Sequence, residues 1–367
     1  MLRGLTPIFL TAAASLVWQA ALAQERVIPA EETVAALTDP DWAPPRTSWG
    51  HPSLEGTWST DDMRTVPRER AEEVGTRSEL TDEEWAERVN RQTGGRDRAV
   101  NEETFSARSE WGIRTFGFSS QVIDPPNGRL PPMTEAGLAR AAPRDRGTFG
   151  PGPFDDFDDF TLYDRCITRG ILGSKFPVVY GNGLRIVQTP DSVAISYEMI
   201  HDTRVIKLDG RSHLDDGIRQ YLGTSRGHWE GDTLVVETQN LTDRTSIGAN
   251  GNGTRHSRTM QITERFTRVD PEMIEYVAHV DDPVTYTAPF TIRLMLTTQP
   301  NYRIYEYSCH EGNGAVSHAL SGERDYERRV AEALARGESA PERIPSSRNL
   351  GSLPEDDSVF FDVNAGE

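Results

Sequence analysis

Polar side chains that can move protons stand at two places where predicted strands give way to turns. These side chains are His201, Asp202 and Arg204 at the first place, and His310, Glu311 and Asn313 at the second. A neutral imidazole can accept a proton, a carboxylate can orient the imidazole, and an amide or guanidinium group can hold a developing anion. Strand ends meet at one rim when a sheet closes into a barrel. We therefore predict one small-molecule site with catalytic His201, Asp202, His310 and Glu311, and substrate-binding Arg204, His213 and Asn313.

The alternatives at these positions stay open. His310 and Glu311 can simply end a strand and face water. Glu198 and His201 match the E-x-x-H spacing of helical di-iron proteins, but on a strand residues three apart face opposite sides. His201 then lies with Tyr197 and Met199, which also fits a hydrogen-bonded core histidine. Ser225 lies in a G-x-S-x-G pattern, yet a strand rather than a helix is predicted to follow, so the pattern does not indicate a nucleophile.

The spacing of metal-ligand residues does not indicate a metal or any other cofactor. The acidic run 155–159 lacks the spacing and distal glutamate of a calcium loop. The eight histidines form no H-x-x-H or H-E-x-x-H pattern. A zinc site built from histidines distant in sequence is the alternative, because zinc ligands need not be neighbours. Its members would come from His201, His213, His228 and His310.

Alternating apolar and polar residues predict a series of short strands. The predicted strands are 184–188, 193–199, 205–208, 233–238, 260–267, 273–280, 290–297 and 303–309. Turn residues separate most of them, and no helix of 10–15 residues lies between them, which favours an antiparallel β-barrel or sandwich. Gly56-Thr-Trp58 resembles the G-x-W opening of lipocalin-like barrels.

The chain divides into four parts by composition. We predict a signal peptide at 1–23, an irregular wrapping segment at 24–160, an antiparallel β domain at 161–320, and a C-terminal helix with a loose acidic tail at 321–367. Two short helices are expected in the wrapping segment. The first runs from Thr81 to about Asn90 and begins with a capping box of Thr81 and Glu84, and the second runs from Thr134 to Ala142.

The N-terminus predicts export. Arg3, an apolar run and Ala21-Leu-Ala23 form the charged, apolar and small-residue regions of a secretory signal cut after Ala23, so we expect a periplasmic or secreted protein. Two cysteines in an oxidising compartment predict one disulfide, Cys166–Cys309. The net charge of −18 disfavours nucleic acid and anionic membranes as partners, and no stable membrane insertion is expected of the mature chain.

Several motifs together resemble a large family of signal-bearing bacterial proteins. The matching strings are Ile186-Val-Gln-Thr-Pro, Glu198-Met-Ile-His-Asp, Leu208-Asp-Gly-Arg-Ser-His, Trp229-Glu-Gly-Asp-Thr-Leu-Val-Val-Glu-Thr, Glu264-Arg-Phe-Thr-Arg-Val-Asp and Tyr305-Glu-Tyr-Ser-Cys-His-Glu-Gly-Asn. The resemblance covers about residues 105–325, and it implies an exported, β-rich domain.

These features favour an acid–base enzyme, a lyase, hydratase or hydrolase, that acts on a small molecule or sugar derivative. A lipocalin-like carrier of an apolar ligand and a structural module of the cell envelope are the alternatives, because a fold does not determine a function. A pocket lined by His201 or His310 would favour the enzyme, and an apolar barrel interior would favour the carrier.

Overall fold

The computed structural model describes residues 42–101, 110–141, 154–249 and 253–342. The predicted signal peptide and most of the predicted acidic tail lie outside these residues. Helices are present at both places expected in the wrapping segment, as α2 (Asp82–Asn101) and α3 (Glu135–Ala141), but α2 continues beyond its expected end at about Asn90. The capping box of α2 forms as predicted, because the Thr81 backbone N–H donates to the Glu84 carboxylate at 2.7 Å.

Ten strands form a single sheet. They are β1 (Gly56–Ser59), β2 (Val122–Asp124), β3 (Gly183–Thr189), β4 (Ser192–Tyr197), β5 (Thr203–Lys207), β6 (Thr224–Glu230), β7 (Thr233–Gln239), β8 (Gln261–Asp270), β9 (Met273–Asp281) and β10 (Phe290–Thr297). All neighbours are antiparallel except β5 and β6, which meet in parallel at Lys207 and Arg226. Their connection, residues 208–223, is long enough to carry the chain back so that β6 can start in the same direction as β5.

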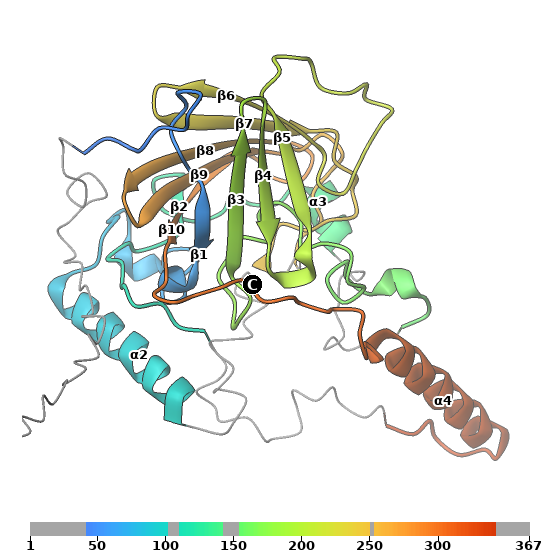
Figure 1. Cartoon of the computed structure of the whole chain (residues 1–367). Coiled ribbons are helices and arrows are strands. Elements are labelled where there is room, and N and C mark those ends of the chain that lie inside the picture. Colours follow the sequence, from blue (N-terminus) through green and yellow to red (C-terminus); the bar gives the residue numbers. More distant parts are fainter. Residues whose placement is uncertain (1–41, 102–109, 142–153, 250–252, 343–367) are drawn as a thin grey trace, which may run out of the picture.

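The sheet closes into a barrel (Figure 1) because β1 pairs with β3 on one side and with β10 on the other. The ring contains nine strands, and β2 adds to the outside edge of β10. The predicted β-barrel is thus confirmed, and its closure decides against the sandwich. Closure also leaves the ring without an open edge, which removes a site for unwanted strand pairing.

Four details of the sequence prediction were wrong. The wrapping segment supplies β1 and β2, although we expected only loops and short helices there. The predicted strand 193–199 ends at Tyr197. Residues 303–309 form no strand, since the pairing of β1 with β10 has already closed the ring. The C-terminal helix α4 (Ala315–Ala335) begins before the predicted boundary at 321.

Alternate residues of the strands fill the barrel. Along β8, Ile262, Glu264 and Phe266 are buried, and Tyr276 and Ala278 of the neighbouring β9 are buried with them. This period of two is expected where one face of a sheet covers the core. The apolar core continues outside the strands through residues 171, 172 and 176, which precede β3.

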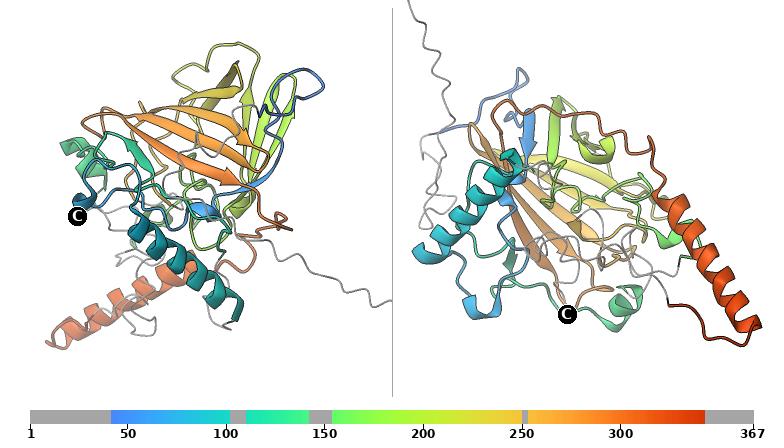
Figure 2. Two further views of the ribbon diagram at one scale, coloured as in Figure 1. Left: turned by 90° about the vertical axis from the view of Figure 1, so that its left-hand side faces the viewer. Right: turned by 90° about the horizontal axis from the view of Figure 1, so that it is seen from below.

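The chain between β10 and α4, residues 298–314, is the crossing segment. It runs across the end of the barrel where β3 begins and β4 ends (Figure 1). Helices α2 and α4 lie at this same end on opposite sides, as Figure 1 and the view from below in Figure 2 show. No helix in the described part of the chain is long and apolar enough to span a membrane.

Candidate functional site

Two of the predicted site residues, His201 and Asn313, make hydrogen bonds at the barrel end covered by the crossing segment, but no contact among the described residues joins them to each other. The His201 ring donates from Nδ1 to the carbonyl oxygen of Tyr307, at 3.0 Å. Asn313 donates from Nδ2 to the carbonyl oxygen of Asp164 at 3.0 Å, and the same nitrogen lies 3.2 Å from the sulfur of Cys166. The predicted Cys166–Cys309 disulfide is present and fastens the crossing segment at the same place.

The other predicted residues are arranged differently. Arg204 points into the barrel, where it is buried. His213 accepts or donates a hydrogen bond with the Thr224 hydroxyl at 3.1 Å, in the connection that follows the far end of β5. His310 and Glu311 are exposed in the turn before α4. Asp202 is half-buried, and its backbone carbonyl receives the Tyr197 N–H at 2.9 Å. The catalytic roles assigned to these residues stay predictions.

A tight turn explains why the E-x-x-H pair separates. The turn η5 (Met199–His201) links β4 to β5, and Ile200 and His201 have φ angles of 68° and 49°. Such left-handed conformations are uncommon outside glycine, and they break the alternation of a strand. Glu198 therefore turns inward and is buried, whereas His201 remains exposed.

The side chains of three acidic residues, Asp61, Glu110 and Glu198, lie close to residues 181–183, which are just before and at the start of β3. The Gly181 N–H donates to Glu110 Oε2 at 2.8 Å, and the Asn182 side chain donates to Asp61 Oδ1 at 2.7 Å. The backbone N–H of Glu198 donates to the carbonyl oxygen of Gly183 at 2.9 Å. The missing side chain of Gly183 lets the Glu198 carboxylate and the Tyr302 hydroxyl approach the backbone closely, since a Cβ atom there would overlap both of them. Residues 181–183 thus place Asp61, Glu110 and Glu198 around one short stretch of backbone.

Burial and mutual repulsion change the acidity of these carboxyl groups. Desolvation, followed by the charge of Asp61, raises the pKa of Glu110 to about 7, although hydrogen bonds from the N–H groups of residues 181 and 182 oppose the shift. Desolvation also raises the pKa values of Asp61 and Glu198. Glu110 is only half-buried, so this carboxyl group can exchange its proton with solvent or a ligand.

Tyr302 of the crossing segment completes this group of carboxyls. Its hydroxyl donates a short hydrogen bond to Glu198 Oε2, and the Tyr305 N–H lies 3.4 Å from Glu198 Oε1. Burial, the bond to Glu198 and the nearby carboxylates raise the pKa of Tyr302, so the phenol keeps its proton. The site therefore combines a half-buried carboxyl group that titrates near neutrality with a protonated hydroxyl donor.

A second set of charges lies inside the barrel. The buried Glu264 accepts two hydrogen bonds from Arg204, at 2.5 and 3.1 Å. Lys175 Nζ and the Tyr276 hydroxyl both donate to Glu264 Oε1, at 3.2 and 2.9 Å. Burial by itself would raise the pKa of Glu264, but the charges of Arg204 and Lys175 lower it to about 2. These four side chains, Lys175, Arg204, Glu264 and Tyr276, form the Glu264 cluster. Its hydrogen bonds and ion pairs link strands β5, β8 and β9 inside the barrel.

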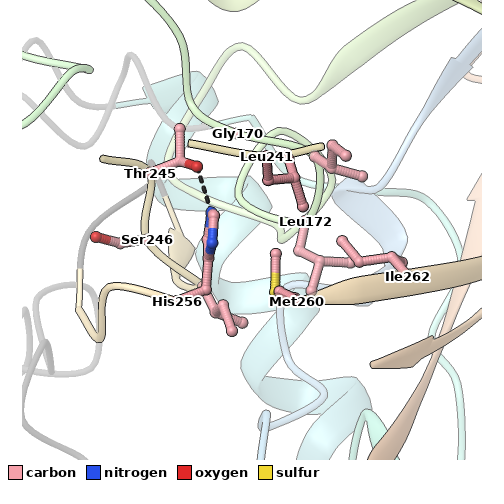
Figure 3. A pocket seen from close by; sticks show the side chains of 10 residues that line it. Gly170, Leu172, Leu241, Thr245, Ser246, His256, Met260 and Ile262 are labelled. Atoms are coloured by element: carbon pink, nitrogen blue, oxygen red, sulfur yellow. Dashed lines mark hydrogen bonds between the residues drawn. The ribbon is translucent and has the colours of Figure 1, made fainter. Parts of the chain in front are cut away.

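A third polar group borders a small cavity between β8 and the segment that precedes β3 (Figure 3). His256 donates from Nδ1 to the Ser257 carbonyl oxygen at 2.9 Å, and its Nε2 atom receives the Thr245 hydroxyl. Burial lowers the pKa of His256, so the ring is neutral. The cavity measures about 10 Å³, close to the least volume that admits one water molecule. This volume is too small for an organic substrate.

The sequence prediction did not include Glu110, Asp61 or Tyr302. Glu110 and Asp61 stand in the irregular wrapping segment, where no periodicity indicates their direction. Tyr302 belongs to the crossing segment, which we expected to be partly a strand. The available signal was Gly181-Asn-Gly183 directly before a buried strand, since glycine often marks a close approach of backbone and side chains.

Comparison with known proteins finds no matching family model, no matching curated protein and no matching solved structure. The motif resemblance to a family of exported bacterial proteins therefore stays a prediction. Among the described residues, no group of three or more histidine, cysteine, aspartate or glutamate side chains is placed to hold a metal ion.

Proposed function

We propose that this protein is an exported enzyme that uses acid–base chemistry at the barrel end covered by the crossing segment. Its substrate would be a small molecule or sugar derivative, and its reaction an elimination, a hydration or a hydrolysis. The observation that carries the proposal is Glu110. Its carboxyl group is half-buried and accepts a hydrogen bond from the Gly181 N–H. Its pKa of about 7 suits a group that must gain and lose a proton at neutral pH.

Each residue of the site has a role that follows from its contacts. Glu110 acts as the general base, because its carboxylate accepts hydrogen bonds and reaches the surface. Glu198, whose pKa is raised by burial, supplies a proton, and Tyr302, which keeps its own proton, positions the Glu198 carboxyl group through a hydrogen bond. His201 positions the crossing segment through its bond to Tyr307 and does not itself contact the carboxyl groups.

The barrel interior supports this site over the lipocalin-like alternative. Large side chains and the Glu264 cluster occupy the space that a carrier would use for its ligand, with Tyr197, Phe266 and Tyr276 all buried. A ligand is thus better accommodated at the barrel end. The disulfide supports export, because such bridges persist in oxidising compartments.

A screen of the mature protein against sugar derivatives and small organic acids, with mass detection of products, tests the proposal. We expect at least one conversion, and we expect Glu110→Gln to slow it by about 10²–10⁴-fold, the effect of losing a general base. Glu275→Gln is the matched control. Glu275 is also a partly buried glutamate with a raised pKa, but it lies on β9 outside the site. Equal activity of Glu110→Gln and wild type would contradict the assignment.

A further inference from the structure

Arg169 is a buried cation whose hydrogen-bonding capacity is largely unused. Its side chain is 1 % exposed. The two Nη atoms reach only the carbonyl oxygens of Gly181 and Phe176, at 3.3 and 3.5 Å, which is long for an N–H···O bond. Its Nε atom has no hydrogen-bond partner, and no acidic side chain of the described residues forms an ion pair with the guanidinium group. Burying a charge in this way costs free energy that the fold does not recover.

Other buried arginines of this molecule are better satisfied. Arg204 has the Glu264 carboxylate, and Arg88 donates to the carbonyl oxygens of Phe116 and Phe118 at 2.8 and 2.5 Å. Arg169 is buried as deeply, but it has no carboxylate partner among the described residues and its bonds to carbonyl oxygens are longer, at 3.3 and 3.5 Å. The difference indicates that a partner from outside the chain completes its environment.

The surroundings of Arg169 suit a ligand more than a solid core. Four tyrosines lie near its charge, and three of them, Tyr163, Tyr180 and Tyr307, are partly exposed. The hydroxyls of Tyr163 and Tyr307 are hydrogen-bonded to each other. Tyr307 belongs to the crossing segment, and partly exposed side chains of this kind can change rotamer on a fast timescale.

Arg169 also adjoins the proposed catalytic base. Gly181 connects them, because its N–H donates to Glu110 and its carbonyl oxygen accepts from Arg169. We propose that Arg169 binds a carboxylate group of the substrate, which makes the substrate a small carboxylic acid such as an acidic sugar. A planar guanidinium with an unused Nε matches the two oxygens of a carboxylate. The role in catalysis rests on the proposed function, whereas the binding itself does not.

Thermal unfolding of the mature, disulfide-bonded protein with D-glucuronate tests this inference. D-glucose and sodium chloride at equal ionic strength are the controls. Glucuronate should raise the Tm by about 2 °C or more at saturating concentration, because a ligand that binds only the folded state stabilises it. Arg169→Gln should weaken glucuronate binding at least tenfold by calorimetry. In sodium chloride alone its Tm should equal or exceed that of wild type, since the substitution removes an uncompensated buried charge.

Arg88→Gln is the matched variant and should give the opposite pattern, a lower Tm with the glucuronate effect retained. A Tm loss in Arg169→Gln as large as in Arg88→Gln, or a glucuronate effect no greater than that of the controls, would show that Arg169 is structural and overturn the inference. Glu110→Gln should still bind glucuronate. Binding without any turnover would refute only the proposed function, and turnover of a neutral substrate unchanged by Arg169→Gln would refute only the assignment of a carboxylic acid as the substrate.

Discussion

Glu264 is an anion that forms ion pairs with two buried cations, Lys175 and Arg204. All three side chains are almost fully buried. Removing one partner of a buried ion pair leaves an uncompensated charge and typically costs about 3–5 kcal/mol. We expect Glu264→Gln to lower the free energy of unfolding by about that amount at pH 7, measured by urea denaturation. Glu230→Gln, which loses only exposed partners, should cost less than about 1 kcal/mol.

The difference in stability between wild type and Glu264→Gln should depend on pH. The pKa of Glu264 falls from 4.5 to about 2 on folding, so its stabilising contribution is present above pH 4.5 and is lost as the pH falls through about 2. Wild type should therefore lose its advantage over Glu264→Gln between these values. An advantage that stays constant from pH 5 to pH 2 would mean that the carboxylate is not held by the two cations.

Glu110 should affect stability with the opposite sign. Its pKa rises from 4.5 to about 7 on folding, so the protonated form is favoured in the folded protein and stability falls as the pH rises through about 7. Glu110→Gln removes this penalty. The variant should be more stable than wild type by about 1–3 kcal/mol at pH 8, and the difference should vanish below pH 4.5. Urea denaturation at the two pH values measures it, and a pH-independent difference would count against the raised pKa.

For single residues, only part of the site could be predicted from the sequence. His201 does contact Tyr307 of the crossing segment, but not through two strand ends at one rim as predicted, because residues 303–309 form no strand. The direction of Arg204 could not be predicted, because a predicted loop position became an inward position of β5. Glu110 lies 71 residues before Gly181 in sequence, and only the folded chain brings the two together.

The crossing segment is an element without regular secondary structure, and the Cys166–Cys309 disulfide fixes one end of it. The bridge closes a loop of 143 residues, which in the chain-entropy model stabilises the fold by about 4–5 kcal/mol. We expect the double variant Cys166→Ala/Cys309→Ala to lose a similar free energy of unfolding. Hydrogen exchange should rise most in residues 302–313 and 163–169, which the bridge joins. Unchanged protection in these two segments would show that the bridge does not position the crossing segment.

Strand prediction was successful where alternation extended over six or more residues, as in β8 and β9. It failed for β1, whose four residues are too few for a periodic signal, although Trp58 is among the most deeply buried side chains. It also failed for residues 303–309, which alternate but have no strand edge to join. Pairing partners, rather than local pattern, decide such short segments.

The whole molecule is a filled barrel, and helices α2 and α4 and the crossing segment lie at one end of it. The barrel class could be predicted, because many short strands with turns between them admit few architectures. Which barrel end carries a site could not, because that depends on the long-range contacts of residues 61, 110 and 169 with the start of β3. The account therefore depends most on the acidity of one carboxyl group at that end.

A carboxyl ¹³C NMR titration of the mature protein, with Glu110→Gln to assign the resonance, measures that acidity without knowledge of the substrate. The account predicts a pKa for Glu110 of about 7, and a lower value once Asp61→Asn removes the neighbouring charge. A pKa near the ordinary 4.5 of glutamate would contradict it, because the carboxyl group would then have no special capacity for proton transfer at neutral pH.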